Sequence, residues 1–231
     1  MARDEVLLEL VSNGRQAGAA LRTYAWTAPT LSLGYFQSIA DVEAEPRWQG
    51  VPLVRRPTGG GAILHHHEVT YALAVANGHP LARGGGDLYR AVHSALAGIL
   101  RELGVDVVRR GAVPPSGKAR PFLCFTDKTA EDVVVGALKI IGSAQRRRAG
   151  AMLQHGSILL ARAPLAPELS GLLDLATLPI DATGLAELIG RRVPEALGFF
   201  SLPSAWSDGA LRRAGEIEVE VYRNPAWNRR R

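Results

Sequence analysis

Residues 53–73 read LVRRPTGGGAILHHHEVTYAL, and this stretch predicts a tight loop between two strands. The three glycines at 59–61 have no Cβ, so the backbone can adopt positive φ and approach a ligand closely. The apolar residues at 62–64 and the run at 69–75 predict strands after the loop. Glycine clusters are also common in ordinary turns, so the loop alone indicates a binding site only moderately.

Two arginines, Arg55 and Arg56, directly precede the loop and are followed by Pro57 and Thr58. Their guanidinium groups are fixed cations with fork-shaped donors. A glycine loop flanked by such groups is a suitable place for an anionic or thioester-linked substrate.

A second pair of motifs lies downstream, KIIGSAQR at 139–146 and LQHGSI at 153–158. Together with the glycine stretch, in this order, they resemble the signature of the lipoate–protein ligase and octanoyltransferase superfamily, which is related to the biotin ligases. The elements LGYFQ at 33–37 and YRNPAWN at 222–228 resemble the same family, so the likeness runs from about residue 4 to about residue 228.

This resemblance implies an α+β fold: a single domain over residues 1–231, with a mixed β-sheet flanked by helices and a mostly helical C-terminal part at 164–231. The local patterns agree with that expectation. Their spacing predicts elements that include a helix at 4–13 capped by Asp4, a short helix at 41–48, a helix at 87–103, a strand at 105–108, a hairpin at 133–141, and a last strand at 217–222.

Cys124 is the only cysteine, which excludes an intramolecular disulfide and favours a reducing, cytoplasmic location. A free cysteine is usually a small buried hydrophobic residue. Cys124 lies fifteen residues before Lys139 and follows a basic loop at 111–121, and a nearby cation would enrich the thiolate. One branch of octanoyltransferases carries its nucleophilic cysteine in a similar Cys-Phe element, so the resemblance implies that Cys124 is the nucleophile.

Lys139 sits among apolar neighbours on a predicted strand, where an exposed lysine is the ordinary interpretation. Within the motif, it resembles the pocket lysine of the family, which in the ligases contacts the acyl-adenylate. For a transferase, the resemblance implies that Lys139 polarises the thioester carbonyl, helps to hold the thiolate and is the second catalytic residue. The remaining predicted substrate contacts are Arg55, Arg56, Thr58, Gly59, Gly60, Gly61, His65, Gly142, Ser143, Ala144, His155 and Gly156.

The sequence after the glycines, Glu68-Val69-Thr70-Tyr71, resembles the transferases more than the ligases. Gly61 departs from that branch, in which arginine is common at this position, and residues 128–131 also diverge. The function implied is octanoyl transfer from acyl carrier protein to a lysine of a lipoyl domain, such as glycine-cleavage H protein, through a Cys124 acyl-enzyme. Alternatives are an ATP- and Mg-dependent lipoate–protein ligase and an inactive acyl- or nucleotide-binding module.

The formal net charge of +5 indicates an acidic partner, such as nucleic acid, an anionic membrane or an acidic protein, or equally an organism whose proteins are rich in arginine. Acyl carriers and lipoyl domains, the partners that the resemblance implies, are typically acidic. No nucleic-acid-binding motif is recognised, and no run of residues is apolar enough to cross a membrane. On a strand, His65 and His67 would share a face, but two ligands without a third at metal spacing do not make a site, so no metal is expected. The transfer reaction that the resemblance implies requires no cofactor. Acyl-chain length, the exact acceptor and the oligomeric state are not determined by the sequence.

Overall fold

The computed structural model describes residues 1–231 apart from 15–17, 85, 112–120, 128, 149 and 231. Its centre is a six-stranded, fully antiparallel sheet in the order β1-β5-β9-β8-β7-β6. The strands are β1 (Ala19–Tyr24), β5 (Glu68–Ala76), β6 (Val108–Arg109), β7 (Val133–Val135), β8 (Leu138–Arg148) and β9 (Ala151–Leu159).

A second, smaller sheet carries the glycine stretch. It has the order β3-β2-β4, with β2 (Thr30–Leu33) parallel to β3 (Leu53–Arg55) and antiparallel to β4 (Ile63–His65). The α+β expectation is therefore confirmed, and the mixed pairing lies in the small sheet while the main sheet is antiparallel.

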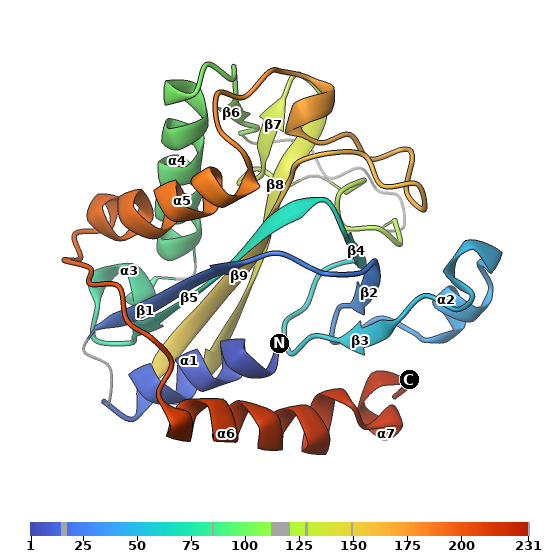
Figure 1. Ribbon diagram of the computed structural model, residues 1–231, viewed down its shortest axis with the longest axis horizontal. Coiled ribbons are helices and arrows are strands. Elements are labelled where there is room, and N and C mark those ends of the chain that lie inside the picture. Colours follow the sequence, from blue (N-terminus) through green and yellow to red (C-terminus); the bar gives the residue numbers. More distant parts are fainter. Residues whose placement is uncertain (15–17, 85, 112–120, 128, 149, 231) are drawn as a thin grey trace.

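Helices cover both faces of the main sheet (Figure 1). Along β5, large side chains at alternate positions, such as Val69 and Leu73, pack in one buried cluster with α4 (Asp87–Glu102) and α5 (Ala182–Ala196). The intervening alanines, Ala72 and Ala74, pack against α1 (Ala2–Ser12) on the other face. Because successive strand residues face opposite sides, the apolar run in β5 provides core contacts for both helical layers.

The helix α1 lies between the sheet and α6 (Asp208–Ile217), so it is buried on two sides. Asp4 was expected to cap this helix, and that prediction is wrong. The helix begins at Ala2, and the Asp4 carboxylate is fully buried and accepts a hydrogen bond from Arg22 Nη1 at 2.9 Å. A cap would have faced solvent, whereas this carboxylate faces the sheet.

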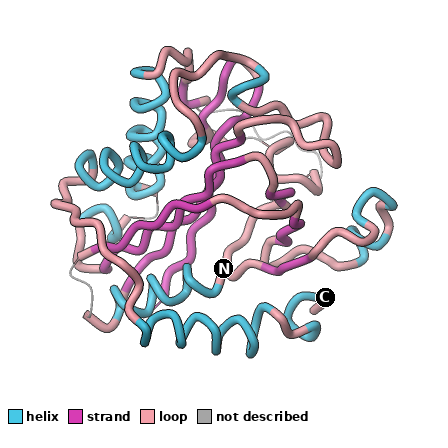
Figure 2. Tube along the Cα trace, viewed as in Figure 1, coloured by secondary structure: helices cyan, strands magenta, loops and turns pink. Residues whose placement is uncertain are grey.

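The C-terminal part differs from the sequence prediction in two places (Figure 2). The predicted strand at 217–222 is helical, with Glu218–Tyr222 continuing α6, because Ile217 and Tyr222 pack with Val6 of α1. Between residues 164 and 180 the chain is mostly turns, with only the short helix Leu172–Asp174.

The predicted strand at 105–108 is also wrong over most of its length, since β6 begins at Val108.

Four short helices complete the described structure. The predicted helix at 41–48 is two separate short helices. Most of the predicted loop at 111–121 lies outside the described residues. The short helices are α2 (Ala40–Glu43), a 3-10 helix at Pro46–Trp48, α3 (Pro80–Arg83) and α7 (Pro225–Asn228). Among the described residues, no helix combines the length and apolar character needed to cross a bilayer.

The C-terminal segment is joined to β3 by Asn228. Its Oδ1 accepts a hydrogen bond from the Arg55 backbone N–H at 2.9 Å, and its Nδ2 donates to the Tyr222 carbonyl at 2.7 Å. The indole Nε1 of Trp227 donates to the Arg55 carbonyl at 2.8 Å. These bonds give partners to the backbone N–H and carbonyl of Arg55, the last residue of β3, after which the glycine loop starts.

Asn228→Ala should lower the free energy of unfolding by about 1–3 kcal/mol, because it leaves a buried backbone N–H and a buried carbonyl without partners. Urea denaturation measures the change, with exposed Asn13→Ala as the matched control. Equal stability of the two variants would contradict this role for Asn228.

Candidate active site

The glycine loop connects β3 to β4 and packs against the end of β2. Gly60 has φ +91°, a conformation that side-chain-bearing residues rarely adopt. A Cβ on Gly34 would lie 1.9 Å from the Gly60 carbonyl oxygen. The loop can therefore hold this position only because both residues are glycine.

Cys124 is fixed to the other side of the same loop by backbone hydrogen bonds. The Ala62 N–H donates to the Phe122 carbonyl at 2.7 Å, and the Cys124 N–H donates to the Ala62 carbonyl at 2.7 Å. A Cβ on Gly61 would lie 2.9 Å from the Cys124 nitrogen. The glycine at position 61 is therefore required by the close approach of the cysteine segment, which the sequence pattern did not reveal.

Lys139, at the start of β8, reaches the cysteine from the main sheet. Its buried ammonium lies 3.7 Å from Cys124 Sγ and donates to the Cys124 carbonyl at 3.1 Å and the Asp127 carbonyl at 3.2 Å. Cys124 itself is partly exposed, as the predicted nucleophile should be. The structure thus brings the two predicted catalytic residues together.

Asp132 is a member of this group that the sequence analysis did not find. Its Oδ2 lies 3.0 Å from Lys139 Nζ, and both side chains are almost completely buried. The Thr129 backbone N–H donates to the same carboxylate at 2.6 Å and fixes its position. A buried lysine requires a counter-charge. The acidic residue just before β7, opposite Lys139 in the β7–β8 hairpin, was therefore the sequence signal that could have identified Asp132.

A pocket with about 390 Å³ of empty space, part of it open to solvent, lies beside these residues. Residues predicted from the glycine stretch that line it are Arg56, Gly60 and His65. Those predicted from the later segments are Cys124, Gly142, Ser143, Ala144, His155 and Gly156. Lining residues that were not predicted are Met1, Tyr24, Ile63, Thr70 and Ser157.

The other predicted contacts lie behind the pocket wall. Arg55 is fully buried and donates to the carbonyls of Gly34, Gln37 and Arg230, so it holds backbone segments together. Thr58 is buried against His155, and Gly59 and Gly61 shape the loop.

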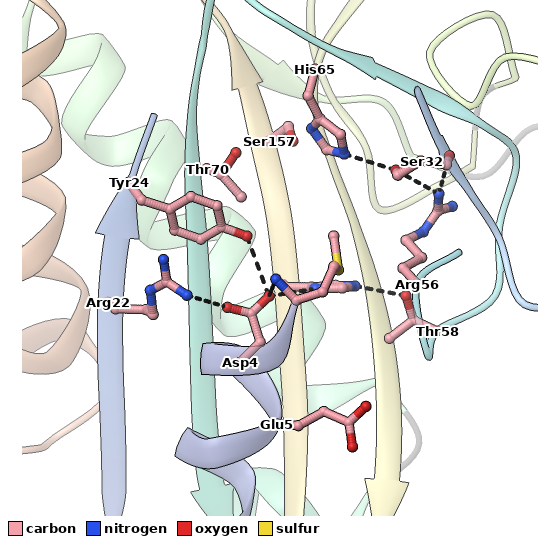
Figure 3. A network of polar contacts seen from close by, with 12 residues as sticks. Asp4, Glu5, Arg22, Tyr24, Ser32, Arg56, Thr58, His65, Thr70 and Ser157 are labelled. Carbon is pink, nitrogen blue, oxygen red and sulfur yellow. Dashed lines mark hydrogen bonds and ion pairs between the residues drawn. The ribbon is translucent and has the colours of Figure 1, made fainter. Parts of the chain in front are cut away.

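Two buried histidines, each held between a carboxylate and a hydroxyl, support the glycine stretch. Figure 3 shows the contact of one of them, His65, with Ser32. His155 lies 3.3 Å from Asp4 Oδ2 through Nδ1 and 2.6 Å from Thr58 Oγ1 through Nε2. Burial lowers the pKa of His155, whereas the hydrogen bond and the negative charge of Asp4 act to raise it.

The second histidine, His65, lies 2.6 Å from Glu68 Oε1 through Nδ1 and 2.7 Å from Ser32 Oγ through Nε2. Its ring stacks on Trp26 at a centroid distance of 4.1 Å. Both imidazoles are therefore held in fixed orientations at the edge of the pocket.

A third histidine, His93 of α4, supports the lysine strand. Its Nδ1 lies 2.6 Å from the Glu131 carbonyl, so Nδ1 carries the proton and donates. Its Nε2 lies 2.6 Å from Ser143 Oγ and accepts from that hydroxyl, which in turn contacts Tyr71. Burial lowers the pKa of His93 to about 4, so the ring is neutral near pH 7. His93 thereby links the pocket wall at Ser143 to the residue preceding Asp132.

Metal-binding clusters were sought among the histidines, cysteine and carboxylates. The part of the chain that the structure describes contains no group of three or more such side chains arranged to hold a metal ion.

Sequence comparisons identify relatives of the whole chain. Residues 1–170 match the family described as lipoyl protein ligase A/B catalytic domain. The octanoyltransferase LipM of Moorella thermoacetica is 40% identical over 84% of this chain and 75% of its own length. LipM of Kyrpidia tusciae is 34% identical over 100% of this chain and 94% of its own length.

Structural comparisons agree in fold. A putative lipoate protein ligase from T. acidophilum, Ta0514, has a TM-score of 0.79 with 22% identity, covering 99% of this chain and 92% of that chain. A lipoate-protein ligase A bound with ATP has a TM-score of 0.78 with 22% identity and the same coverage. At this identity the likeness establishes the shared fold.

His93→Gln should flatten the acid dependence of stability. The folded pKa of His93, about 4, is below the ordinary histidine value of 6.5, so the folded state binds fewer protons between these values. The contribution of His93 is complete above pH 6.5 and is lost as the pH falls towards 4. From pH 7 to pH 5, the wild-type free energy of unfolding should fall by about 2 kcal/mol more than that of the variant.

Urea denaturation at several pH values measures this difference. The substitution His67→Gln, at an exposed position, is the matched control. This variant should show the same dependence of the free energy of unfolding on pH as the wild type. If the free energy of unfolding changes with pH equally in His93→Gln and His67→Gln, the buried neutral His93 is not the cause of the loss of stability in acid.

Proposed function

This chain belongs to the lipoyl protein ligase A/B catalytic domain family and is an octanoyltransferase of lipoate biosynthesis; we propose that Cys124 carries the octanoyl group between donor and acceptor. The observation that carries the proposal is the 3.7 Å contact between Cys124 Sγ and Lys139 Nζ at the wall of the pocket. A sulfur nucleophile and a fixed ammonium group are the components that acyl transfer through a thioester requires.

In the first half-reaction, the Cys124 thiolate attacks the thioester carbonyl of octanoyl-acyl carrier protein. A bond forms between Sγ and the carbonyl carbon, and the bond to the carrier sulfur breaks. The carrier leaves as a thiolate and takes a proton from solvent. Lys139 stabilises the negative charge that develops on the carbonyl oxygen.

In the second half-reaction, the neutral amine of a lipoyl-domain lysine attacks the Cys124 thioester. The new amide C–N bond replaces the bond to Sγ, the amine loses a proton to solvent, and the Cys124 thiolate is restored. No bond to phosphate is made or broken in either half, so the proposal includes no nucleotide.

The partners we propose are octanoylated acyl carrier protein and a lipoyl domain such as glycine-cleavage H protein. The excess of 27 Lys and Arg over 22 Asp and Glu supports docking of acidic proteins. Two arginines of β8 have structural contacts within the protein: Arg146 donates to the Pro57 carbonyl and Arg147 donates to the Ala82 carbonyl. We further propose a cytoplasmic location, because the Cys124 thiol must remain reduced to react.

We propose that residues 1–231 act as one catalytic domain. The support is the packing of α6 against α1 and the hydrogen bonds from Asn228 and Trp227 to Arg55. These contacts connect the C-terminal helices to the strand that carries the glycine loop.

Incubation with octanoyl-acyl carrier protein, without ATP or magnesium, tests the function. The wild type should gain the mass of one octanoyl group as a hydroxylamine-labile thioester and pass it to a lipoyl domain. Cys124→Ala should gain none. Full transfer activity of Cys124→Ala that depends on ATP and magnesium would instead support a ligase, and no labelling by either donor would support a binding module.

Gly142→Ala should slow acylation of Cys124 by roughly 100-fold, because small misplacements of a catalytic group are costly. A Cβ at this position would lie 2.7 Å from Lys139 Cε, so the lysine side chain must move. Single-turnover acylation kinetics measure the effect. Gly98→Ala on α4 is the control, since a Cβ there meets no atom within 4 Å. Equal rates for the two variants would show that the lysine position is not critical.

A further inference from the structure

The pocket crosses the strands of the main sheet, because four of its lining residues form one row of paired positions. Gly142 on β8 pairs with Ser157 on β9. Ser157 in turn pairs with Thr70 on β5, and Thr70 pairs with Tyr24 on β1. Figure 3 shows Tyr24, Thr70 and Ser157 on these neighbouring strands. Since neighbouring strands lie about 4.8 Å apart, the row spans roughly 14 Å from β8 to β1.

The predicted catalytic residues lie at the β8 end of this row. A Cβ on Gly142 would lie 3.2 Å from Lys139 Nζ, and that ammonium lies 3.7 Å from Cys124 Sγ. Cys124 also lines the pocket. An acyl group that is attached to Sγ and enters the pocket therefore begins beside β8 and extends over β9 and β5 towards β1.

The hydroxyl groups in the middle of the row are bonded to the protein. Ser157 Oγ donates to Glu68 Oε1 at 2.8 Å, and Thr70 Oγ1 donates to the same oxygen at 2.5 Å. Trp26 Nε1 donates to Thr70 Oγ1 at 3.0 Å. Most of the surface that faces the pocket is apolar. The middle of the pocket is therefore suited to a hydrocarbon chain, which needs no polar partners.

Tyr24 lies at the far end of the row and is held in place by two charged side chains. Its hydroxyl donates to the buried carboxylate of Asp4, at 3.3 Å from Oδ2, and the Arg22 guanidinium lies over its ring at 3.8 Å from the centroid. Arg22 Nη1 also donates to Asp4 Oδ1 at 2.9 Å, so the three side chains fix one another. Burial raises the pKa of Tyr24, so its phenol stays neutral. The result is a fixed aromatic wall on β1, the edge strand of the main sheet.

We propose that Tyr24 sets the maximum length of the acyl chain that the enzyme transfers, because its ring closes the pocket beyond the space that an octanoyl chain fills. The inference rests on the proposed function, in which Cys124 carries the acyl group. Two inter-strand steps, about 10 Å, separate β8 from β5, which is comparable with the length of an extended octanoyl chain.

The ring of Tyr24 limits the pocket from the β1 side, since it extends from β1 towards Asp4 (Figure 3). A longer chain would meet this ring. A shorter chain would leave part of the apolar pocket unfilled and lose the burial of the missing methylene groups. Both effects favour a chain of medium length.

Competition between two acyl donors tests the inference. The enzyme is offered an equal mixture of octanoyl- and decanoyl-acyl carrier protein, and intact-protein mass spectrometry early in the reaction gives the ratio of the two Cys124 acyl-enzymes. This ratio reports the relative kcat/KM for the two donors. A loss of folded protein leaves the ratio unchanged, because both products form on the same molecules. The wild type should favour octanoyl.

Tyr24→Ala removes the ring and should raise the decanoyl-to-octanoyl ratio by roughly tenfold or more, the usual scale of discrimination for methylene groups in an apolar pocket. Tyr24→Leu keeps a shorter apolar side chain and should raise the ratio by less. Tyr24→Phe is the matched control. It keeps the ring and loses only the hydroxyl, so its ratio should stay within about twofold of the wild type. If circular dichroism shows that Tyr24→Ala does not fold, Tyr24→Leu decides the question.

An unchanged ratio in both Tyr24→Ala and Tyr24→Leu would overturn the inference, because the pocket would then end elsewhere. A rise in Tyr24→Phe as large as that in Tyr24→Ala would also overturn it, since the contact with Asp4 rather than the ring would control chain length. Equal use of both donors by the wild type would contradict a length limit. Failure of the proposed function looks different: the wild type would gain neither acyl group on Cys124.

Discussion

The backbone contact between the glycine loop and the cysteine segment is the constraint on which the site depends. Ala62 exchanges two hydrogen bonds with the chain around Leu123, and Gly61 is small enough for the Cys124 backbone to lie against it. This contact joins the small sheet, which carries the loop, to the segment that carries the sulfur. Lys139 then reaches the same point from the main sheet, so the Cys124 sulfur lies where the two sheets meet.

Charge is distributed unevenly across that meeting point. On the side of the main sheet, Lys139 and Asp132 form a buried pair that is neutral overall. On the side of the small sheet, Arg56 is buried among neutral acceptors. Cys124 contacts Lys139 and lines the same pocket as Arg56.

The elements with strong local patterns were predicted well, and the tertiary roles of single residues were not. The helix at 87–102 and the hairpin around Gly136 followed from spacing and turn chemistry, because their signals are local. The end of α6 was predicted as a strand, because its alternating residues do not reveal the packing of Ile217 and Tyr222 on α1. Within the site, motifs pointed to Cys124 and Lys139, but the ion pair with Asp132 and the internal role of Arg55 depend on contacts that sequence spacing does not specify.

A structure of the trapped octanoyl-enzyme tests the central claim most directly, since the account places the acylated sulfur at the contact between the two sheets. The predicted result is continuous density from Cys124 Sγ into the pocket lined by Ala144, His155 and Gly156, with the thioester oxygen within hydrogen-bond distance of Lys139 Nζ. An octanoyl group attached to another residue, or a Cys124 thioester directed away from this pocket and from Lys139, would contradict the account.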